Sequence, residues 1–160
     1  AGPLARWLAG RVAVPEGAAV LWVPLGARRL VERGYDQAML VAVPFAREAR
    51  RPLLRGALRR LRETRPQVGS DRAARAANVD GAFVASRAVA GQDLVLVDDV
   101  VTTGGSTIKA LKAAEANRLV IDAVIVLVDR CEQNGRQNIE ALGYPVYDIL
   151  TVRDFLPPGN

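Results

Sequence analysis

The residues whose types and spacing could do chemistry lie in one stretch, LVLVDDVVTTGGST, which runs from Leu94 to Thr107. An apolar run there ends in two adjacent carboxylates, Asp98 and Asp99, and a loop of glycines and hydroxyl residues follows. A glycine-rich turn lets backbone N–H groups approach a phosphate, and the positive end of a following helix favours the negative charge. Carboxylates repel phosphate, so the pair must bind another group, such as sugar hydroxyls or hydrated Mg²⁺. The stretch therefore predicts a site for a phosphorylated sugar.

The predicted phosphate-binding residues form a turn that leads into a helix. Each is a glycine or carries a hydroxyl group: Thr102, Thr103, Gly104, Gly105, Ser106 and Thr107. The alternative is a buried strand whose aspartates and glycines only cap the helix. Because two acids, four hydroxyl residues and two glycines coincide at one predicted turn, we favour the binding site.

The elements that must position these residues alternate between strands and helices. Apolar or β-branched runs predict strands at 18–24, 52–61, 81–85, 93–99, 119–129 and 145–152. Amphipathic patterns predict helices at 35–50, 105–117 and 136–142, and Pro44 should kink or shorten the first of them. This alternation predicts an α/β fold in which residues 1–160 form a single domain, with a mostly parallel central sheet and helices on both faces. Ligands of such sheets bind beyond the carboxyl ends of the strands, where Asp98, Asp99 and the turn would lie.

Two further segments lack a clear strand or helix pattern. We expect residues 25–34 to form a loop after the first strand. Residues 62–80 are polar and contain Pro66 and Gly69, which predicts a mobile loop that runs into a short helix.

Composition excludes several classes of protein. Half of the 160 residues are hydrophobic, enough for the core of one domain, and no apolar run approaches the length of a membrane span. The single cysteine, Cys131, cannot form an intrachain disulfide, which favours a reducing compartment and predicts a cytoplasmic protein. The absence of histidine excludes nucleophiles activated by histidine and the common zinc sites that contain it.

The basic residues are almost all arginine, the exceptions being Lys109 and Lys112, and they concentrate between Arg28 and Arg75. A guanidinium offers a planar set of donors that suits phosphate and carboxylate groups. The segment therefore indicates a polyphosphate metabolite or a nucleic acid as partner, and the alternative for each arginine is a solvated surface position.

The segment VLVDDVVTTGGST resembles the signature of type I phosphoribosyltransferases for phosphoribosyl pyrophosphate (PRPP) over 13 residues. The resemblance implies the three-layer fold of that family, with a mobile loop over the active site. It implies that Asp98 and Asp99 hold the ribose hydroxyls and that residues 102–107 hold the 5-phosphate. The loop after the first strand, with Gly26, Ala27 and Arg28, would hold the pyrophosphate. Mg²⁺ would bind together with PRPP, with Asp98 as a candidate ligand.

The two halves of the chain resemble different branches of this family. VPLGARRLVERGYDQA and the segment 53–83 are similar to ComF-type proteins, which are linked to DNA uptake in competent bacteria. From about Leu94 the chain is similar to orotate phosphoribosyltransferases, and the two similarities meet near residues 88–94. The second similarity implies that Arg130 faces the orotate carboxylate and that Thr102 lies beside the base. The chain has no loop lysines or histidine of the orotate enzymes, so Arg62 and Arg65 become the candidates for catalysis.

Three functions remain open from the sequence. The first is a phosphoribosyltransferase that transfers phosphoribosyl from PRPP to a nucleobase, with orotate as the best match and pyrophosphate as the second product. The second is a ComF-like accessory protein that binds PRPP or single-stranded DNA, although few aromatic residues are present for base stacking. The third is an inactive, engineered recombinant of the two branches. We expect a homodimer that does not associate with membranes.

Overall fold

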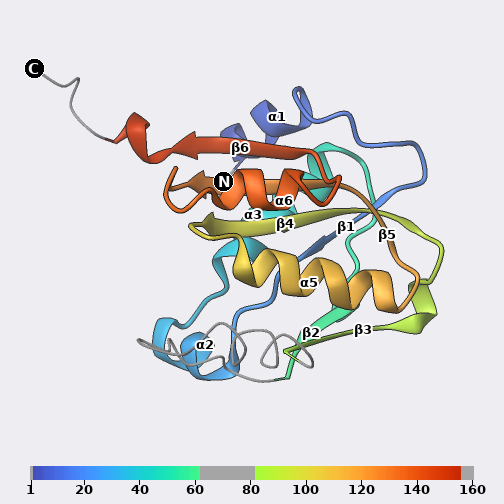
Figure 1. The fold of residues 1–160 in the computed structure, drawn as a ribbon. Coiled ribbons are helices and arrows are strands. Elements are labelled where there is room, and N and C mark those ends of the chain that lie inside the picture. The colour runs from blue at the N-terminus through green and yellow to red at the C-terminus, as the bar shows by residue number, and fades with distance from the viewer. Residues whose placement is uncertain (1, 62–81, 156–160) are drawn as a thin grey trace, which may run out of the picture.

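A computed structural model describes residues 2–61 and 82–155 of the chain, and its centre is a parallel β-sheet (Figure 1). Within these residues the sheet has four strands in the order β1-β4-β5-β6, and each neighbouring pair is parallel. The strands are β1 (Ala19–Trp22), β4 (Asp93–Val101), β5 (Val120–Asp129) and β6 (Val146–Thr151). The prediction of an α/β fold with a mostly parallel sheet is therefore confirmed.

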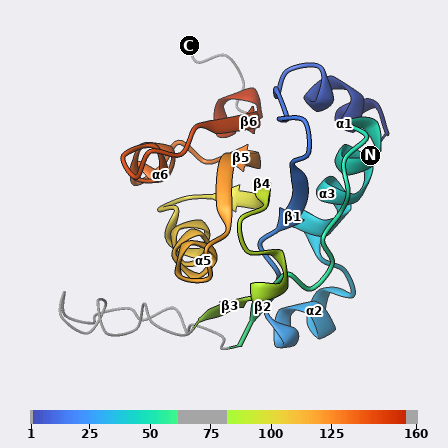
Figure 2. The same cartoon turned by 90° about the vertical axis from the view of Figure 1, so that its right-hand side faces the viewer.

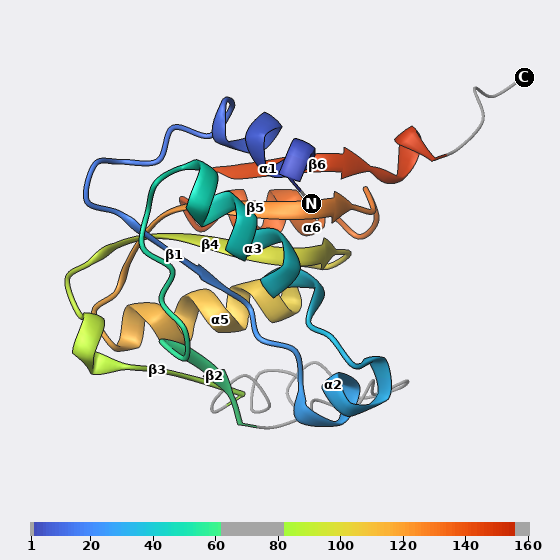
Figure 3. The same ribbon diagram turned by 180° about the vertical axis from the view of Figure 1, so that it is seen from behind.

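Helices cover both faces of this sheet, which gives the molecule three layers (Figure 2). One face carries α5 (Gly105–Ala116) and α6 (Gly135–Glu140). The opposite face carries α1 (Gly2–Ala9) and α3 (Gln37–Glu48), which lie in front of the sheet in Figure 3.

Alternating residues of β4 bind the three layers together. Leu94 and Leu96 pack in one buried cluster with Leu111 of α5, whereas Val95 and Val97 pack in another with Phe45 of α3. Successive side chains of a strand point to opposite faces, so a strand buried on both faces must be apolar at every position. This explains the continuous apolar run that leads to Asp98.

A second, smaller sheet lies beside α5. It consists of β2 (Leu58–Arg60) and β3 (Phe83–Ala85), which pair antiparallel. Two short 3₁₀ helices, Arg87–Val89 and Val152–Asp154, precede β4 and follow β6. No helix in the described part of the chain is long and apolar enough to cross a membrane.

The structure differs from the sequence-based prediction at two helices. Residues 25–34 were expected to form a loop, but they contain α2 (Ala27–Arg33), which ends at Gly34 with φ 78°. The first predicted helix, expected at 35–50, is α3 and spans Gln37–Glu48, so it is two residues shorter at each end and continues through Pro44. Val41 and Phe45, on either side of the proline, are buried, and this packing offsets the hydrogen bond that a proline removes from a helix.

Candidate functional site

A cavity of about 770 Å³ lies where β1, β4 and β5 reach their carboxyl ends, at the left of the sheet in Figure 1. Its wall is strongly polar. The charged residues in it are Arg29, Arg33, Arg60 and Arg130, together with Asp36, Asp98 and Asp99. Thr102 and Ser106 contribute hydroxyl groups. The cavity therefore contains both predicted acids, part of the predicted phosphate loop and the predicted base-binding arginine.

Asp98 is the more deeply buried member of the acid pair, with 2% of its surface exposed. The hydroxyl of Thr107 donates a hydrogen bond of 2.6 Å to its Oδ2, and the backbone N–H of Asp99 donates one of 2.8 Å to its Oδ1. Burial, and next the neighbouring charge of Asp99, raise the pKa of Asp98 to about 8. Asp99 is only half-buried, so its carboxylate is the more accessible acceptor for a ligand.

The predicted phosphate loop is a tight turn at the beginning of α5. Gly104 has φ 75°, a conformation that side chains other than glycine rarely adopt, and it supplies no side-chain cap for the helix. The N–H of Gly105 donates to Oγ1 of Thr103 at 3.2 Å. The hydroxyl of Thr107, which was expected at the phosphate, is instead fully buried against Asp98. Thr102 and Ser106 remain as loop hydroxyls in the cavity wall.

The segment after β5 supports this loop from behind, and the sequence did not reveal it. A Cβ atom on Gly135 would lie 2.4 Å from the carbonyl oxygen of Thr102, so only glycine fits there. Asn138 donates a hydrogen bond of 3.0 Å to the carbonyl oxygen of Thr103. The start of α6 therefore fixes the backbone of the phosphate loop.

A second support holds the loop after β1, where the pyrophosphate was expected. The buried carboxylate of Asp36 accepts hydrogen bonds from the backbone N–H of Leu25 at 2.9 Å and from the indole N–H of Trp22 at 3.2 Å. It also caps α3, because its other oxygen accepts the N–H of Met39 at 3.2 Å. One carboxylate thus joins the end of β1, the loop and the helix behind it.

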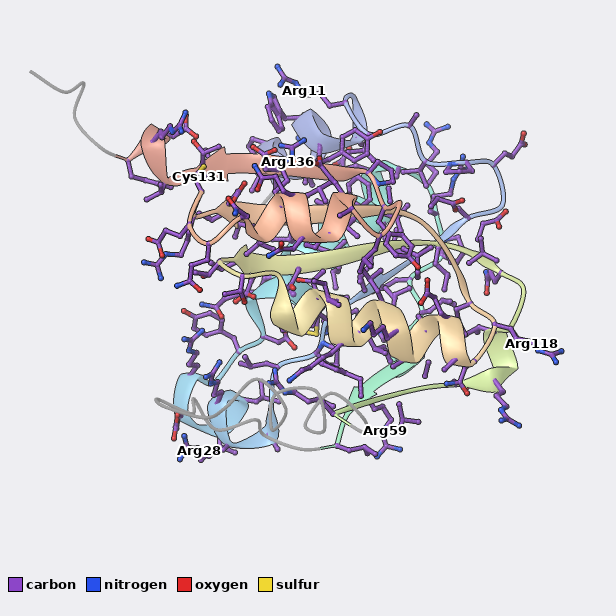
Figure 4. The ribbon with its side chains drawn as sticks, viewed as in Figure 1. Arg11, Arg28, Arg59, Arg118, Cys131 and Arg136 are labelled. Carbon is purple, nitrogen blue, oxygen red and sulfur yellow. The ribbon has the colours of Figure 1, made fainter. Side chains whose placement is uncertain are left out.

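The arginines of α2 point in different directions. Arg28, the residue singled out from the sequence, lies on the outer side of α2 in Figure 4 and forms an ion pair with Glu32 at 3.5 Å. Arg29 and Arg33 line the cavity instead. Gly26 is the N-cap of α2 and Ala27 its first residue. Arg29 and Arg33 are four residues apart, so their side chains lie on one face of the helix. The sequence could indicate this only if a helix had been predicted for this segment.

Arg130, which the sequence analysis placed at the base, follows β5 directly and lines the cavity. Its guanidinium donates a hydrogen bond of 3.0 Å to Glu132. Arg62 and Arg65, the candidates for catalysis, lie outside the described residues.

Comparison with known proteins adds two findings. No protein-family model matches the chain. A segment of 69 residues is 45% identical to orotate phosphoribosyltransferase of Sorangium cellulosum and covers 43% of this chain and 35% of that protein. The chain spans about a third of the length of the curated relatives it matches.

Solved structures resemble nearly the whole chain. Adenine phosphoribosyltransferase of Thermoanaerobacter pseudethanolicus aligns with a TM-score of 0.64 and 18% identity over 93% of this chain and 78% of that one. Orotate phosphoribosyltransferase of Mycobacterium tuberculosis in complex with PRPP aligns with a TM-score of 0.56 and 22% identity over 96% and 72% of the two chains. Because the sequence identity to these structures is low, the similarity establishes the fold alone, which is that of type I phosphoribosyltransferases.

Proposed function

We propose that the protein transfers the phosphoribosyl group of PRPP to orotate and releases pyrophosphate. The observation that carries this proposal is the arrangement of residues 98–107, in which an acid pair and a glycine-containing phosphate loop meet at one end of the sheet. The identity with orotate phosphoribosyltransferases in the local sequence comparison supports orotate as the acceptor.

PRPP fits the distribution of charge in the cavity. The turn at 102–106 would bind the 5-phosphate through N–H groups at the start of α5 and through the hydroxyls of Thr102 and Ser106. Asp99, and Asp98 once it is ionised, would accept hydrogen bonds from the ribose hydroxyls. The loop backbone at Gly26 and Ala27 would face the pyrophosphate, and we retain Arg62 and Arg65 as groups that act on it during turnover.

We expect Mg²⁺ to bind together with the phosphorylated substrate, through carboxylates of the protein and oxygens of the substrate. The described residues contain no group of three or more histidine, cysteine or acidic side chains that could hold a metal ion. Mg²⁺ commonly binds through one or two carboxylates and the oxygens of a phosphorylated substrate, and Asp98 and Asp99 offer such carboxylates beside the cavity. The ion would neutralise charge on the pyrophosphate.

The reaction is a displacement at C1 of the ribose. A ring nitrogen of orotate, which gives up its proton to solvent, forms the new bond to C1, while the bond from C1 to pyrophosphate breaks and its electron pair leaves with the pyrophosphate. Positive charge develops on the sugar, as in glycoside chemistry. The protein's contribution is to position both reactants and to stabilise the negative charge of the leaving group with the arginines of the cavity wall.

Arg130 would select the acceptor by pairing with the orotate carboxylate, and Thr102 would lie beside the base. Replacement of Arg130 by alanine should raise KM for orotate at least about tenfold, the loss expected for one charge-assisted hydrogen bond. KM for PRPP should stay unchanged. A wild-type protein that binds PRPP but releases no pyrophosphate with orotate, uracil or purines would refute the proposed reaction.

A ComF-like function is the second candidate, supported by the sequence similarity of residues 23–38 and by the arginines of α2. It predicts binding of single-stranded DNA that weakens steeply with salt and that is lost with the arginines near the cavity. If the protein neither transfers phosphoribosyl to a base nor binds single-stranded DNA, the result would support the third hypothesis, an inactive recombinant.

We further propose that the chain functions as a single-domain homodimer in the cytoplasm. An apolar groove between α1 and α3, lined by Leu4, Leu40, Val41, Pro44 and Leu127, supports a partner surface. Sedimentation equilibrium of the purified protein would test the dimer.

A further inference from the structure

We propose that Asn138 is a positioning residue that couples the phosphate loop to Arg130 through the turn between β5 and α6. The inference rests on the proposed function, because that function gives the loop and the arginine a ligand each. The turn comprises residues 130–134, between the last residue of β5 and the first residue of α6. Arg130 lines the cavity, whereas Asn138 lies on α6 behind the phosphate loop.

The turn has a backbone conformation that L-amino acids rarely adopt. The angle φ is 54° at Cys131, 51° at Gln133 and 55° at Asn134, and none of these residues is glycine. Such a conformation persists only where surrounding contacts hold it. One contact comes from Asp129, whose Oδ1 accepts the backbone N–H of Cys131 at 2.8 Å. The turn therefore depends on its neighbours for its shape.

The turn in its present shape also sets the direction of the Arg130 side chain. Nη2 of Arg130 donates a hydrogen bond of 3.0 Å to Oε1 of Glu132, which lies between two of the left-handed residues. The backbone N–H of Arg130 donates to the carbonyl oxygen of Val101 in β4 at 3.0 Å. The backbone of Arg130 is thus fixed to the sheet, while its guanidinium follows the turn. A different turn would direct the guanidinium away from the acceptor.

Asn138 bonds to this turn and to the phosphate loop with one side-chain nitrogen. Nδ2 donates to the carbonyl oxygen of Gln133 at 3.2 Å and to the carbonyl oxygen of Thr103 at 3.0 Å. An amide nitrogen carries two N–H groups, so both bonds can form at the same time. A ligand that fixes the carbonyl of Thr103 therefore also fixes the amide and its contact with the turn.

The phosphate loop and the residue that follows the turn are in direct backbone contact as well. A Cβ atom on Gly104 would lie 2.8 Å from the carbonyl oxygen of Gly135, and one on Gly135 would lie 2.4 Å from that of Thr102. Segments packed this closely shift together. An occupied phosphate loop should consequently favour the turn that directs Arg130 into the cavity, and an acceptor on Arg130 should favour phosphate binding in return.

The alternative is that Asn138 only stabilises the start of α6. The reactivity of Cys131 separates the two explanations, because this residue lies in the turn, is exposed and is the only cysteine of the chain (Figure 4). Among the described residues of the turn, Arg130 lines the cavity and Cys131 does not, so a ligand on the phosphate loop leaves the thiol uncovered. The measurement is the rate at which N-ethylmaleimide, an uncharged reagent, modifies the thiol with and without ribose 5-phosphate.

Saturating ribose 5-phosphate should slow this reaction in the wild type by about fivefold or more, as for a typical coupling between two sites. The reason is that the S–H of Cys131 donates to the carbonyl oxygen of Asp129 at 3.8 Å in this turn, and a thiol held in that way reacts less readily. In Asn138→Ala the factor should fall by about two- to tenfold, the range for the loss of one hydrogen bond. Because Asn138 is exposed and alanine favours a helix, the variant should fold.

The matched control is Asn117→Ala. It removes a hydrogen bond of 2.9 Å from an asparagine Nδ2 to the carbonyl oxygen of Ala113, at the end of α5 that is remote from the phosphate loop. Figure 4 shows its neighbour Arg118 at the opposite end of the molecule from Cys131. This variant should keep the wild-type factor. Asn138→Asp is measured as a second test variant, since it keeps the shape of the side chain without the two N–H groups and should behave like Asn138→Ala.

Calorimetry of ribose 5-phosphate with and without saturating orotate tests the other direction of the coupling. The two ligands cannot react, because ribose 5-phosphate carries no pyrophosphate to displace. Orotate should raise the affinity for ribose 5-phosphate by about fivefold or more in the wild type, and by less in Asn138→Ala. A factor that survives in Asn138→Ala would mean that the ligands interact directly in the cavity, and it would overturn the role of Asn138.

A thiol reaction that ribose 5-phosphate does not slow in the wild type, or an equal loss of the factor in Asn117→Ala, would also overturn the inference. The outcome is separate from that of the reaction. A wild type with coupled binding that does not convert orotate and PRPP would refute the proposed function and leave the role of Asn138 standing. Turnover without coupling would do the reverse.

Discussion

Replacement of Asp98 by asparagine should make the protein more stable at neutral and alkaline pH. The pKa of Asp98 is raised from 3.8 to about 8 in the folded protein, chiefly by burial and next by the charge of Asp99. An unfolded chain would release this proton near pH 4, so between these two values the folded state holds more protons than the unfolded state. Stability must then fall as the pH rises through this window and level off above about pH 8.

The size of the effect follows from the same linkage. Within this window the group titrates only in the unfolded state. Each increase of one pH unit then lowers the free energy of unfolding by a little over ~1 kcal/mol. From pH 5.5 to 7.5 the wild type should lose roughly 3 kcal/mol that the variant keeps, which corresponds to a difference of about 6–12 °C in Tm for a domain of this size. Near pH 5.5 the two proteins should be similar, because the side chain of Asp98 is then neutral in the folded wild type.

Thermal unfolding followed by circular dichroism at half-unit steps of pH would measure this difference. The matched control is Asp99→Asn, which removes the neighbouring charge but keeps the buried acid. Its pH dependence should remain and shift to lower pH, since burial is the larger cause of the raised pKa. Parallel curves of Tm against pH for wild type and Asp98→Asn would refute the reasoning, because they would mean that Asp98 titrates alike in both states.

Two further substitutions test the supports of the site. Gly135→Ala should lower the affinity for ribose 5-phosphate in calorimetry and cost about 1–3 kcal/mol in chemical unfolding, because the new Cβ would lie 2.4 Å from the carbonyl oxygen of Thr102. Wild-type affinity in this variant would show that the phosphate loop does not depend on α6. Asp36→Asn should cost about 1–3 kcal/mol, since an amide nitrogen cannot accept the N–H groups that the carboxylate binds. It should weaken PRPP binding more than ribose 5-phosphate binding, and an equal loss of both would contradict the local role of Asp36.

The sheet and its acid pair could be predicted because their signals are local. A strand buried on both faces needs an apolar residue at every position, and the run before Asp98 has this pattern. The turn that follows is defined by glycine and hydroxyl residues adjacent in sequence. Helix α2 gave no such signal, because none of its residues is buried and Leu30 and Val31 are exposed at 42% and 86%. Without an apolar face the segment has no helical period to detect.

The supports of the site were missed for a different reason. Gly135 lies against Thr102, and Asp36 accepts the N–H of Trp22, so the residues in each contact are far apart in the sequence. A glycine after a strand and an aspartate before a helix have ordinary local explanations as turn and cap residues. Thr107 is a further example of a tertiary contact that the local sequence does not indicate. Its hydroxyl is of the type expected in a phosphate loop, but in the structure it donates a hydrogen bond to Asp98 of β4.

The burial of Asp98 links the stability of the fold to the action of the site. A carboxylate with 2% of its surface exposed, beside a second carboxylate, opposes folding at neutral pH, so the position is poorly explained by stability alone. The same burial makes an ionised Asp98 a strong acceptor, because little water competes for it, and a cation or ribose hydroxyls would relieve its repulsion with Asp99. Ligand binding should therefore release a proton near neutral pH. Calorimetry of PRPP and Mg²⁺ in buffers of different ionisation enthalpy should detect that proton in the wild type and a smaller release in Asp98→Asn. Equal proton release by the two proteins would assign the titration to another group and separate the buried acid from ligand binding.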